Sequence, residues 1–319
     1  MFYSDVIWTA EFASQQWLYD LTDYVKRRRS EFVPSTLETI EFEDRFFGVP
    51  KQTDAGFLYY RTDKVDQVPE TWQGGYQEAA RSGGIVYQGA AYEGLTVDFL
   101  ELAFAAGGQV LSEDGNTSMI DSPENLEALE FMVGGIRSGA APKAVTTYME
   151  EQARRAFEAG RATFMRNWPY AFSLGSKAPK VKGRFAVAPF PAFEGGGKAG
   201  ILGGHNAVIS VFSQNPNGAV LFVDHMTSPE MMERHAIEFA QAPVLTATYE
   251  DPDVQAALPF AAELMQAVAQ AKSRPVSPVY SQISQAIYKN VNAALSGQTS
   301  AQDALKQADE EITQALGTF

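Results

Sequence analysis

Apolar and polar residues alternate along this chain with two different periods. Short apolar runs rich in Val, Ile, Phe and Tyr have the composition of strands, whereas longer segments repeat their apolar residues at helical spacing. Short strands that alternate with helices predict an α/β fold. Strands are expected at 2–8, 57–60, 162–165, 185–189 and 207–212, with a hairpin over 37–47. Helices are expected at 11–24, 69–84, 96–106, 124–138, 148–159, 217–227, from 228 onward, and at 253–271, 281–295 and 300–316.

The stretch 46–63, FFGVPKQTDAGFLYYRTD, interrupts this pattern with a polar segment directly before an apolar strand. An unpaired carboxylate is costly to bury, so Asp54, close to Gly56, is expected where the backbone is extended and the side chain reaches an open site. The alternative is that Asp54 only caps a turn. The residues alone leave both interpretations open.

Length, charge and cysteine content exclude several functional classes for this protein. A chain of 319 residues is long enough for two lobes, and its net charge of −14 argues against nucleic-acid binding, which needs clustered Lys and Arg. The basic run KRRR at 26–29 is expected at the solvated end of a helix. No apolar run approaches the roughly 18 residues of a membrane span. Cysteine is absent, which excludes disulfides and thiol chemistry.

Familiar catalytic and cofactor motifs are missing. The glycines at 195–197 lack the spacing of a phosphate-binding loop, and the sequence has no GxGxxG or GxSxG. The three histidines, His205, His225 and His235, do not fall at HxxxH spacing, so no metal site is expected. No cofactor and no catalytic residue is predicted. A glycosidase would need two carboxylates across a cleft, and the sequence gives no distance between candidates such as Asp5, Asp54 and Glu93.

Aromatic side chains next to Gly, Pro or polar residues form the remaining signal. Sugars stack their C–H faces on flat rings, and their hydroxyls bond to carboxylates, amides and Arg. For any single ring, packing is the simpler interpretation. Taken together, the set favours a carbohydrate site. Its members are Trp8, Tyr87, Tyr92, Trp168, Tyr170 and Tyr280, with Asp5, Asp54, Gln88 and Arg274 as the polar partners.

Several longer motifs, in order and nearly from end to end, carry a resemblance to a known family. They are DVIWTAEFASQQWLYDL, GVPKQTDAGFLYYRTD, YQGAAYEGL, FMRNWPYAF, LGGHNAVIS and AKSRPVSPVY. With these motifs the chain resembles the extracellular solute-binding proteins of carbohydrate ABC transporters, and within them the trehalose/maltose-binding branch.

The resemblance implies an α/β, two-lobed, periplasmic-binding-protein-like type II fold with hinge crossovers. The first lobe would comprise 1–55 and 205–244, and the second 56–204 and 245–319. It implies the substrate-binding component of a sugar ABC importer, which binds a di- or oligosaccharide between the lobes without catalysis and delivers it to membrane permease subunits. The location would be extracytoplasmic, either periplasmic or lipid-anchored at the cell surface. The alternative is a glycoside-processing enzyme that uses a carboxylate pair.

The resemblance also implies roles for individual residues. Hydroxyl-binding carboxylates would be Asp5 and Asp54, and the stacking platform would be Trp168 with Tyr170. Tyr92 would line the wall of the second lobe, Gly204 would offer a backbone contact, and Arg274 would reach a sugar oxygen. Gln52 and His205 stand where relatives often have aromatic residues, so the preferred sugar is expected to differ from trehalose. Glu11 and Gln88 are weaker candidates.

The beginning of the chain departs from the family pattern. Relatives have a signal sequence and then a βαβ portion of roughly 30 residues or more before the strand equivalent to FYSDVIW. MFYSDVIWTAEF is not a signal peptide. The first lobe is therefore expected to be incomplete, as in a fragment or a misassigned start, with a sheet edge left uncovered. A third hypothesis is that such a chain binds no sugar at all.

Overall fold

The computed structural model describes residues 1–318, which form two compact units. The first comprises Met1–Ala55 and Gly200–Tyr280, and the second comprises Gly56–Ala199 and the chain from Ser281 onward. The resemblance had assigned 245–280 and 200–204 to the second lobe, whereas here they belong to the first unit. The reason is that helix α12 (Ala261–Gln270) contacts strand β4 (Val49–Ala55), and that strand β9 (Leu202–Val208) lies in the same sheet as β4.

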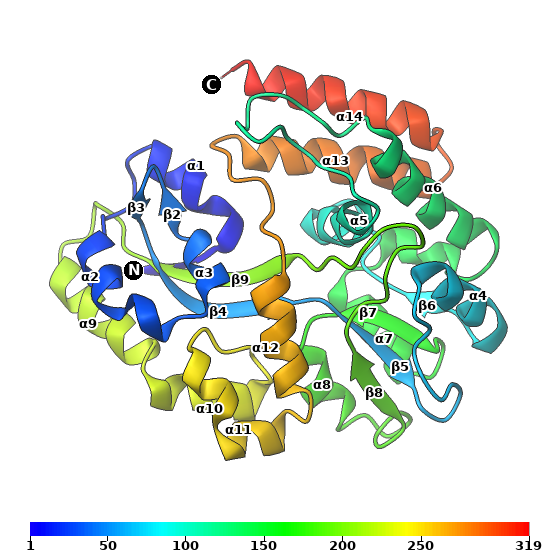
Figure 1. Cartoon of the computed structure of the whole chain (residues 1–319), viewed down its shortest axis with the longest axis horizontal. Helices are drawn as coiled ribbons and strands as arrows, with labels where there is room; N and C mark the ends of the chain where they lie inside the picture. Colours follow the sequence, from blue (N-terminus) through cyan, green and yellow to red (C-terminus); the bar gives the residue numbers. More distant parts are fainter. Residues whose placement is uncertain (319) are drawn as a thin grey trace. The chain divides into compact units, whose positions relative to one another are not determined.

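The first unit is built on a three-stranded antiparallel sheet in the order β1-β9-β4. Its strands are β1 (Phe2–Asp5), β9 (Leu202–Val208) and β4 (Val49–Ala55). Figure 1 shows β9 and β4 side by side as long ribbons within this unit. A cluster of buried residues that includes Val25, Phe32 and Ile40 packs against the sheet residues Val49 and Ala207. A second, smaller cluster of Ala13, Leu18 and Phe47 packs with Val208, the residue that follows Ala207 in β9.

Short helices and a hairpin surround this sheet. They are η1 (Val6–Trp8), α1 (Thr9–Ser14), α2 (Thr22–Arg28), η2 (Arg29–Glu31), α3 (Pro34–Glu38), β2 (Glu41–Phe42), β3 (Arg45–Phe46), α9 (Pro216–Met226), α10 (Pro229–Phe239), η4 (Thr246–Glu250), α11 (Pro252–Ala257) and α12. The helix predicted from residue 228 begins as expected, because the Ser228 side chain accepts the Met231 N–H as an N-cap.

The prediction of two long helices in this unit was wrong, because each segment is interrupted in the structure. The segment 11–24 breaks after α1, where Gln16 adopts a positive φ of 58° and Tyr19 N–H donates to Ile209 O at 2.7 Å. The segment 253–271 divides into α11 and α12 at Pro259, which lacks the N–H that a helix interior needs. In 11–24 a contact with another part of the chain outweighs the helical pattern. In 253–271 the break follows from Pro259, which is visible in the sequence itself.

The second unit contains a four-stranded sheet in the order β6-β7-β5-β8. Its strands are β6 (Ile85–Val86), β7 (Phe164–Asn167), β5 (Phe57–Arg61) and β8 (Phe185–Ala188). β5 runs antiparallel to both neighbours, whereas β6 and β7 are parallel. β7 is buried along its whole length, so the residue that follows it is the first to reach the surface of the unit.

Helices enclose this second sheet. They are α4 (Trp72–Ser82), α5 (Glu93–Ala105), α6 (Pro123–Arg137), η3 (Lys143–Thr147), α7 (Glu150–Glu158), α8 (Tyr170–Gly175), α13 (Tyr280–Leu295) and α14 (Ala301–Leu316). Ser122 caps α6 and Pro123 occupies its first turn, as the sequence predicted. Figure 1 shows α13 and α14 as neighbours, and Lys289 pairs with Glu311 across them at 2.9 Å. Within residues 1–318, none of the helices combines the length and apolarity needed to cross a membrane.

Candidate functional site

The first unit aligns three polar side chains across its sheet. Asp5 of β1 lies opposite His205 of β9, and His205 lies opposite Gln52 of β4. Residues directly opposite on neighbouring antiparallel strands project from the same face, so the three share one side of the sheet. Gln52 Nε2 donates to Asp54 Oδ2 at 2.8 Å, which places Asp54 on that side as well. Carboxylate, amide and imidazole groups therefore gather there, all able to bond hydroxyls.

Arg274 joins this group from the segment after α12. Its Nη2 lies 3.3 Å from Asp5 Oδ1 and also donates to Leu202 O at 3.3 Å. The Arg274 side chain is 4% exposed, whereas that of Asp5 is 28% exposed. Asp5 Oδ1 also accepts the Ile7 N–H at 3.2 Å, so η1 and Arg274 together orient the carboxylate. The exposed part of Asp5 can accept hydrogen bonds from a ligand.

The cavity of about 20 Å³ beside Arg274 is too small for a sugar, since it has room for about one water molecule. Gly204 brings two strands unusually close in the same region. Its φ is +120°, and a Cβ there would lie 2.2 Å from Gln52 O. Only glycine fits this position without strain. The resulting close approach positions Gln52 next to His205 and Asp54.

Three aromatic residues gather in the second unit around the start of α7. Tyr92 precedes α5, Trp168 follows β7, and Tyr170 begins α8. Tyr92 Oη donates to Glu150 Oε2 at 2.7 Å, and Trp168 Nε1 lies 3.5 Å from Glu150 Oε1. Tyr170 Oη donates to Glu151 Oε1 at 3.1 Å. Two adjacent glutamates thus hold all three rings, each of which remains partly exposed.

The environment keeps both tyrosines in the protonated form. Burial and the Glu150 carboxylate raise the pKa of Tyr92 far above its usual range. Burial and Glu151 likewise raise the pKa of Tyr170. A phenol that donates to a carboxylate loses that bond on deprotonation and gains a like-charge repulsion. The rings are therefore stable hydrogen-bonding groups at any physiological pH.

The nine predicted site residues fall into two groups, one in each unit. The first unit holds Asp5, Gln52, Asp54, Gly204, His205 and Arg274, and the second holds Tyr92, Trp168 and Tyr170. The weaker candidate Gln88 is fully buried and accepts from Arg166 Nη1 at 3.1 Å, and Tyr280 is fully buried as well. Tyr87 is 3% exposed, so these two tyrosines take the packing role. Glu11 lies in the first turn of α1.

Sequence reasoning missed Glu150, Glu151 and Arg166. The two glutamates open a strongly amphipathic helix, where acidic residues commonly stabilise the first turn. Arg166 lies in a short apolar strand, and Trp168 comes two residues later on the same face. That spacing was the available signal for a contact between the two side chains.

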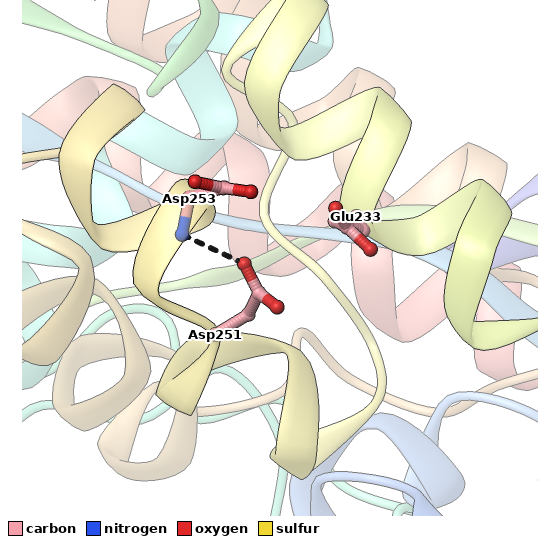
Figure 2. Close-up of side chains that lie close together, drawn as sticks. All are labelled: Glu233, Asp251 and Asp253. Atoms are coloured by element: carbon pink, nitrogen blue, oxygen red, sulfur yellow. Dashed lines mark hydrogen bonds between the residues drawn. The ribbon is translucent and has the colours of Figure 1, made fainter.

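One cluster within residues 1–318 has the donor atoms to hold a metal ion. Glu233 of α10 and Asp251 and Asp253 at the start of α11 have carboxylate oxygens within 4.8 Å of one another (Figure 2). Oxygen ligands of this kind suit a hard cation such as Ca²⁺. However, Asp251 Oδ1 accepts the N–H groups of Asp253 and Val254, at 2.9 and 3.1 Å, as the N-cap of α11. Helix capping accounts for its position, and we assign no metal here.

Comparisons with known proteins identify the family of this chain. A family model described as "Bacterial extracellular solute-binding protein" matches residues 1–233. A Deinococcus radiodurans protein described as a "Probable ABC transporter-binding protein" is 32% identical over 334 residues, which span 98% of this chain and 79% of that protein. A "Maltotriose-binding protein" from Pyrococcus abyssi is 26% identical over 78% of this chain and 55% of its own length.

Solved structures give the same result. The maltose-bound MalE3 protein of T. maritima has a TM-score of 0.92 and 41% identity, over 98% of this chain and 83% of that one. A solute-binding protein of an ABC transporter from Thermotoga lettingae, bound with α-D-tagatose, has a TM-score of 0.90 and 25% identity, over 99% and 84% of the two chains. The predicted α/β fold class and the resemblance to sugar-transporter binding proteins are confirmed. The chain therefore belongs to the bacterial extracellular solute-binding protein family.

Proposed function

We propose that this chain is the substrate-binding component of a sugar ABC importer and binds a di- or oligosaccharide of the maltose type. The observation that carries the proposal is the aromatic group of the second unit, where Trp168, Tyr92 and Tyr170 are oriented by Glu150 and Glu151. An indole ring offers a flat apolar surface to the C–H face of a sugar, and the neighbouring carboxylates can accept hydrogen bonds from the hydroxyl groups of the sugar. The 41% identity to a maltose-bound relative supports this ligand class.

The first unit would contribute the polar part of recognition. Asp5, Gln52 and His205 present an acceptor, an amide and an imidazole from neighbouring strands. Arg274 neutralises part of the Asp5 charge at 3.3 Å, so the carboxylate can bond a neutral ligand without excess negative charge nearby. Gln52 and His205 offer less stacking surface than aromatic residues, so the ligand would be selected there through its hydroxyl groups.

We further propose that the protein has no catalytic role and passes its ligand to membrane permease subunits outside the cytoplasm. Family membership supports an extracytoplasmic location, either periplasmic or lipid-anchored. Two of the three carboxylates that are candidates for glycosidase chemistry, Asp5 and Glu93, have structural partners. Asp5 pairs with Arg274, and Glu93 accepts the hydroxyl of Ser284. A hydrolase needs one carboxyl as acid and another as base or nucleophile, which these partners disfavour.

A thermal-shift panel tests the ligand class. The full chain is heated with maltose, trehalose, sucrose, maltotriose or single amino acids, since one relative is described as an amino-acid transporter protein. A ligand at about 100 times its Kd stabilises the folded state by about 2.7 kcal/mol. At least one saccharide is expected to raise the Tm and the amino acids are not. A shift with amino acids alone would refute the proposal.

Chromogenic glucosides test the absence of catalysis. No release of chromophore above the uncatalysed rate is expected over hours at high protein concentration. Steady release that disappears in Asp54→Asn would instead establish the glycoside-processing alternative. A matched control is Asp114→Asn, which alters an exposed carboxylate in the second unit with local Ser112 and Asn116 partners.

A further inference from the structure

Arg166 is a buried guanidinium whose nitrogens all have acceptors. Its Nε lies 3.0 Å from Asp98 Oδ1 and 2.9 Å from Glu101 Oε2. Nη2 donates to Glu101 Oε1 at 2.5 Å, and Nη1 donates to Gln88 Oε1 at 3.1 Å. Asp98 Oδ1 accepts no hydrogen bond, so its contact with Arg166 is electrostatic. A guanidinium donates within its own plane, so the hydrogen bonds to Glu101 and Gln88 use its edges and leave a flat face for stacking.

One of these faces lies against Trp168. The Arg166 Cζ is 4.0 Å from the centre of the indole ring, well within the range of a cation–π contact. The indole Nε1 is directed to Glu150 from a different element, α7. The ring is thus held on one face by Arg166 and at its polar edge by Glu150, while it stays partly exposed.

The cost of this arrangement points to a role beyond stability. Burying a guanidinium together with two carboxyl groups is expensive, and apolar residues of similar size often give equal or greater stability. The same sheet shows a simpler solution at Arg61, which is 6% exposed and bonds a single carboxylate, Asp63, at 2.6 and 2.7 Å. Arg166 has, beside the Glu101 carboxylate, the Gln88 amide oxygen as a further acceptor, which fixes its orientation as well as its charge.

The surrounding backbone leaves space for this cluster. A Cβ at Gly56 would lie 2.5 Å from Glu101 Oε1 and 2.8 Å from Arg166 Nη2. Contacts this short do not occur for real Cβ atoms, so any larger residue at Gly56, directly before β5, would displace the Arg166–Glu101 pair. The position of the guanidinium is therefore determined by backbone, carboxylates and amide together.

We propose that Arg166 is a positioning residue that fixes the plane of the Trp168 ring for a saccharide, and that Asp98, Glu101 and Gln88 hold Arg166 in the orientation this requires. The inference rests on the proposed function, because it concerns the same ligand. A platform fixed before binding loses less conformational freedom when the ligand arrives. Arg166→Lys keeps the positive charge but removes the flat guanidinium face. It therefore separates the contribution of the charge from that of stacking on Trp168.

The test uses the full chain labelled with ¹⁵N, in which the indole N–H signals of the four tryptophans are assigned by single Trp→Phe variants. Arg166→Lys is expected to shift the Trp168 signal, to speed its hydrogen exchange and to raise the Kd for maltose about tenfold, which corresponds to about 1.4 kcal/mol. The signals of Trp8 and Trp17, in the first unit, should stay unchanged. Arg61→Lys is the matched control and should alter stability without moving the Trp168 signal or the Kd.

An unchanged Trp168 signal in Arg166→Lys, or equal effects from Arg61→Lys, would overturn the inference. If Arg166→Lys does not fold, Glu101→Gln replaces it. That variant keeps side-chain volume and removes one ion-pair partner, and a Trp168 signal identical to that of the wild type would again refute the role. If no saccharide binds the wild-type protein, the proposed function fails. In that case the position of the Trp168 indole N–H signal and its hydrogen-exchange rate alone decide whether Arg166 positions the ring.

Discussion

Trp168 is held by contacts of four kinds. Its ring lies on Arg166, its indole N–H is directed to Glu150, its backbone N–H donates to Asn167 Oδ1 at 2.8 Å, and its carbonyl accepts from Tyr59 Oη at 2.8 Å. A side chain restrained in this way has already lost most of its rotamer freedom before a ligand arrives. The entropy cost of ordering it on binding is correspondingly small.

Trp168→Ala is expected to weaken saccharide binding by about 2 kcal/mol or more, about thirtyfold in Kd, because buried aromatic anchors often dominate such interfaces. Calorimetric titration measures the effect. Trp17→Ala is the control, since Trp17 is a 48% exposed ring of the first unit outside the polar group. Equal affinities for Trp168→Ala and wild type would remove Trp168 from the site.

Asp98 makes stability depend on pH. Burial raises its pKa well above the ordinary value, with Glu101 acting in the same direction and Arg166 opposing. A carboxyl whose native pKa exceeds its unfolded value of about 3.9 holds a proton that the unfolded chain has released, so its contribution to stability is lost as pH rises above about 4. Asp98→Asn should therefore lose less unfolding free energy than wild type between pH 5 and 8.

Urea unfolding at several pH values measures this difference. Asp63→Asn serves as the control with the opposite sign, because the Arg61 hydrogen bond lowers the pKa of Asp63, and that stability is lost as pH falls. Parallel pH profiles for Asp98→Asn and wild type from pH 5 to 8 would contradict the assignment.

At this scale the contacts that support the proposed site lie between residues far apart in the sequence. Asp5 and Arg274, which are 269 positions apart in the chain, are joined by a hydrogen bond that the sequence analysis did not predict. Their roles came from the family resemblance, because no local pattern links such distant residues. Glu150 and Arg166 could not be identified in the same way, since their function depends on contacts across different elements.

At the scale of elements, local signals were reliable where they were strong. Pro123 after Ser122 and Ser300 before α14 marked helix starts that the structure contains. The helical pattern over 11–24 failed because residues after α1 pair with the segment following β9, where Leu18 bridges Ser210. Such pairings form only once the fold is assembled, so periodicity within one segment does not reveal them.

Strand β9 contains an element-scale prediction at Gly204. A side chain there would combine a φ of +120° with a Cβ 2.2 Å from Gln52 O, so Gly204→Ala is expected to lower the unfolding free energy by about 2 kcal/mol or more. Urea denaturation followed by circular dichroism measures it. Gly200→Ala is the matched control, because nothing lies within 4 Å of its Cβ position. Equal stability of the two variants would contradict the close approach of β4 and β9.

At the scale of the whole molecule, the two compact units differ in the side chains that their proposed sites contain. The first gathers carboxylate, amide, imidazole and guanidinium groups, and the second gathers aromatic rings. We therefore expect Asp5→Ala in the first unit and Trp168→Ala in the second each to raise the Kd for a saccharide in calorimetric titration. The family resemblance assigned Asp5 and Asp54 to the first lobe and Trp168 to the second, but its lobe bounds placed Gly204 and Arg274 in the second lobe, whereas both lie in the first unit. It did not predict that 245–280 belongs to the first unit, which depends on the packing of α12 against β4.

Isothermal titration of the wild-type chain with maltose tests the central claim, namely that the protein binds a saccharide, most directly. A saturable isotherm with one ligand per chain is expected for maltose, or for trehalose, sucrose or a maltodextrin in the same series. If none of these sugars gives binding heat at concentrations up to about 1 mM, any binding free energy is weaker than about −4 kcal/mol. That result would contradict the claim that the protein binds a saccharide.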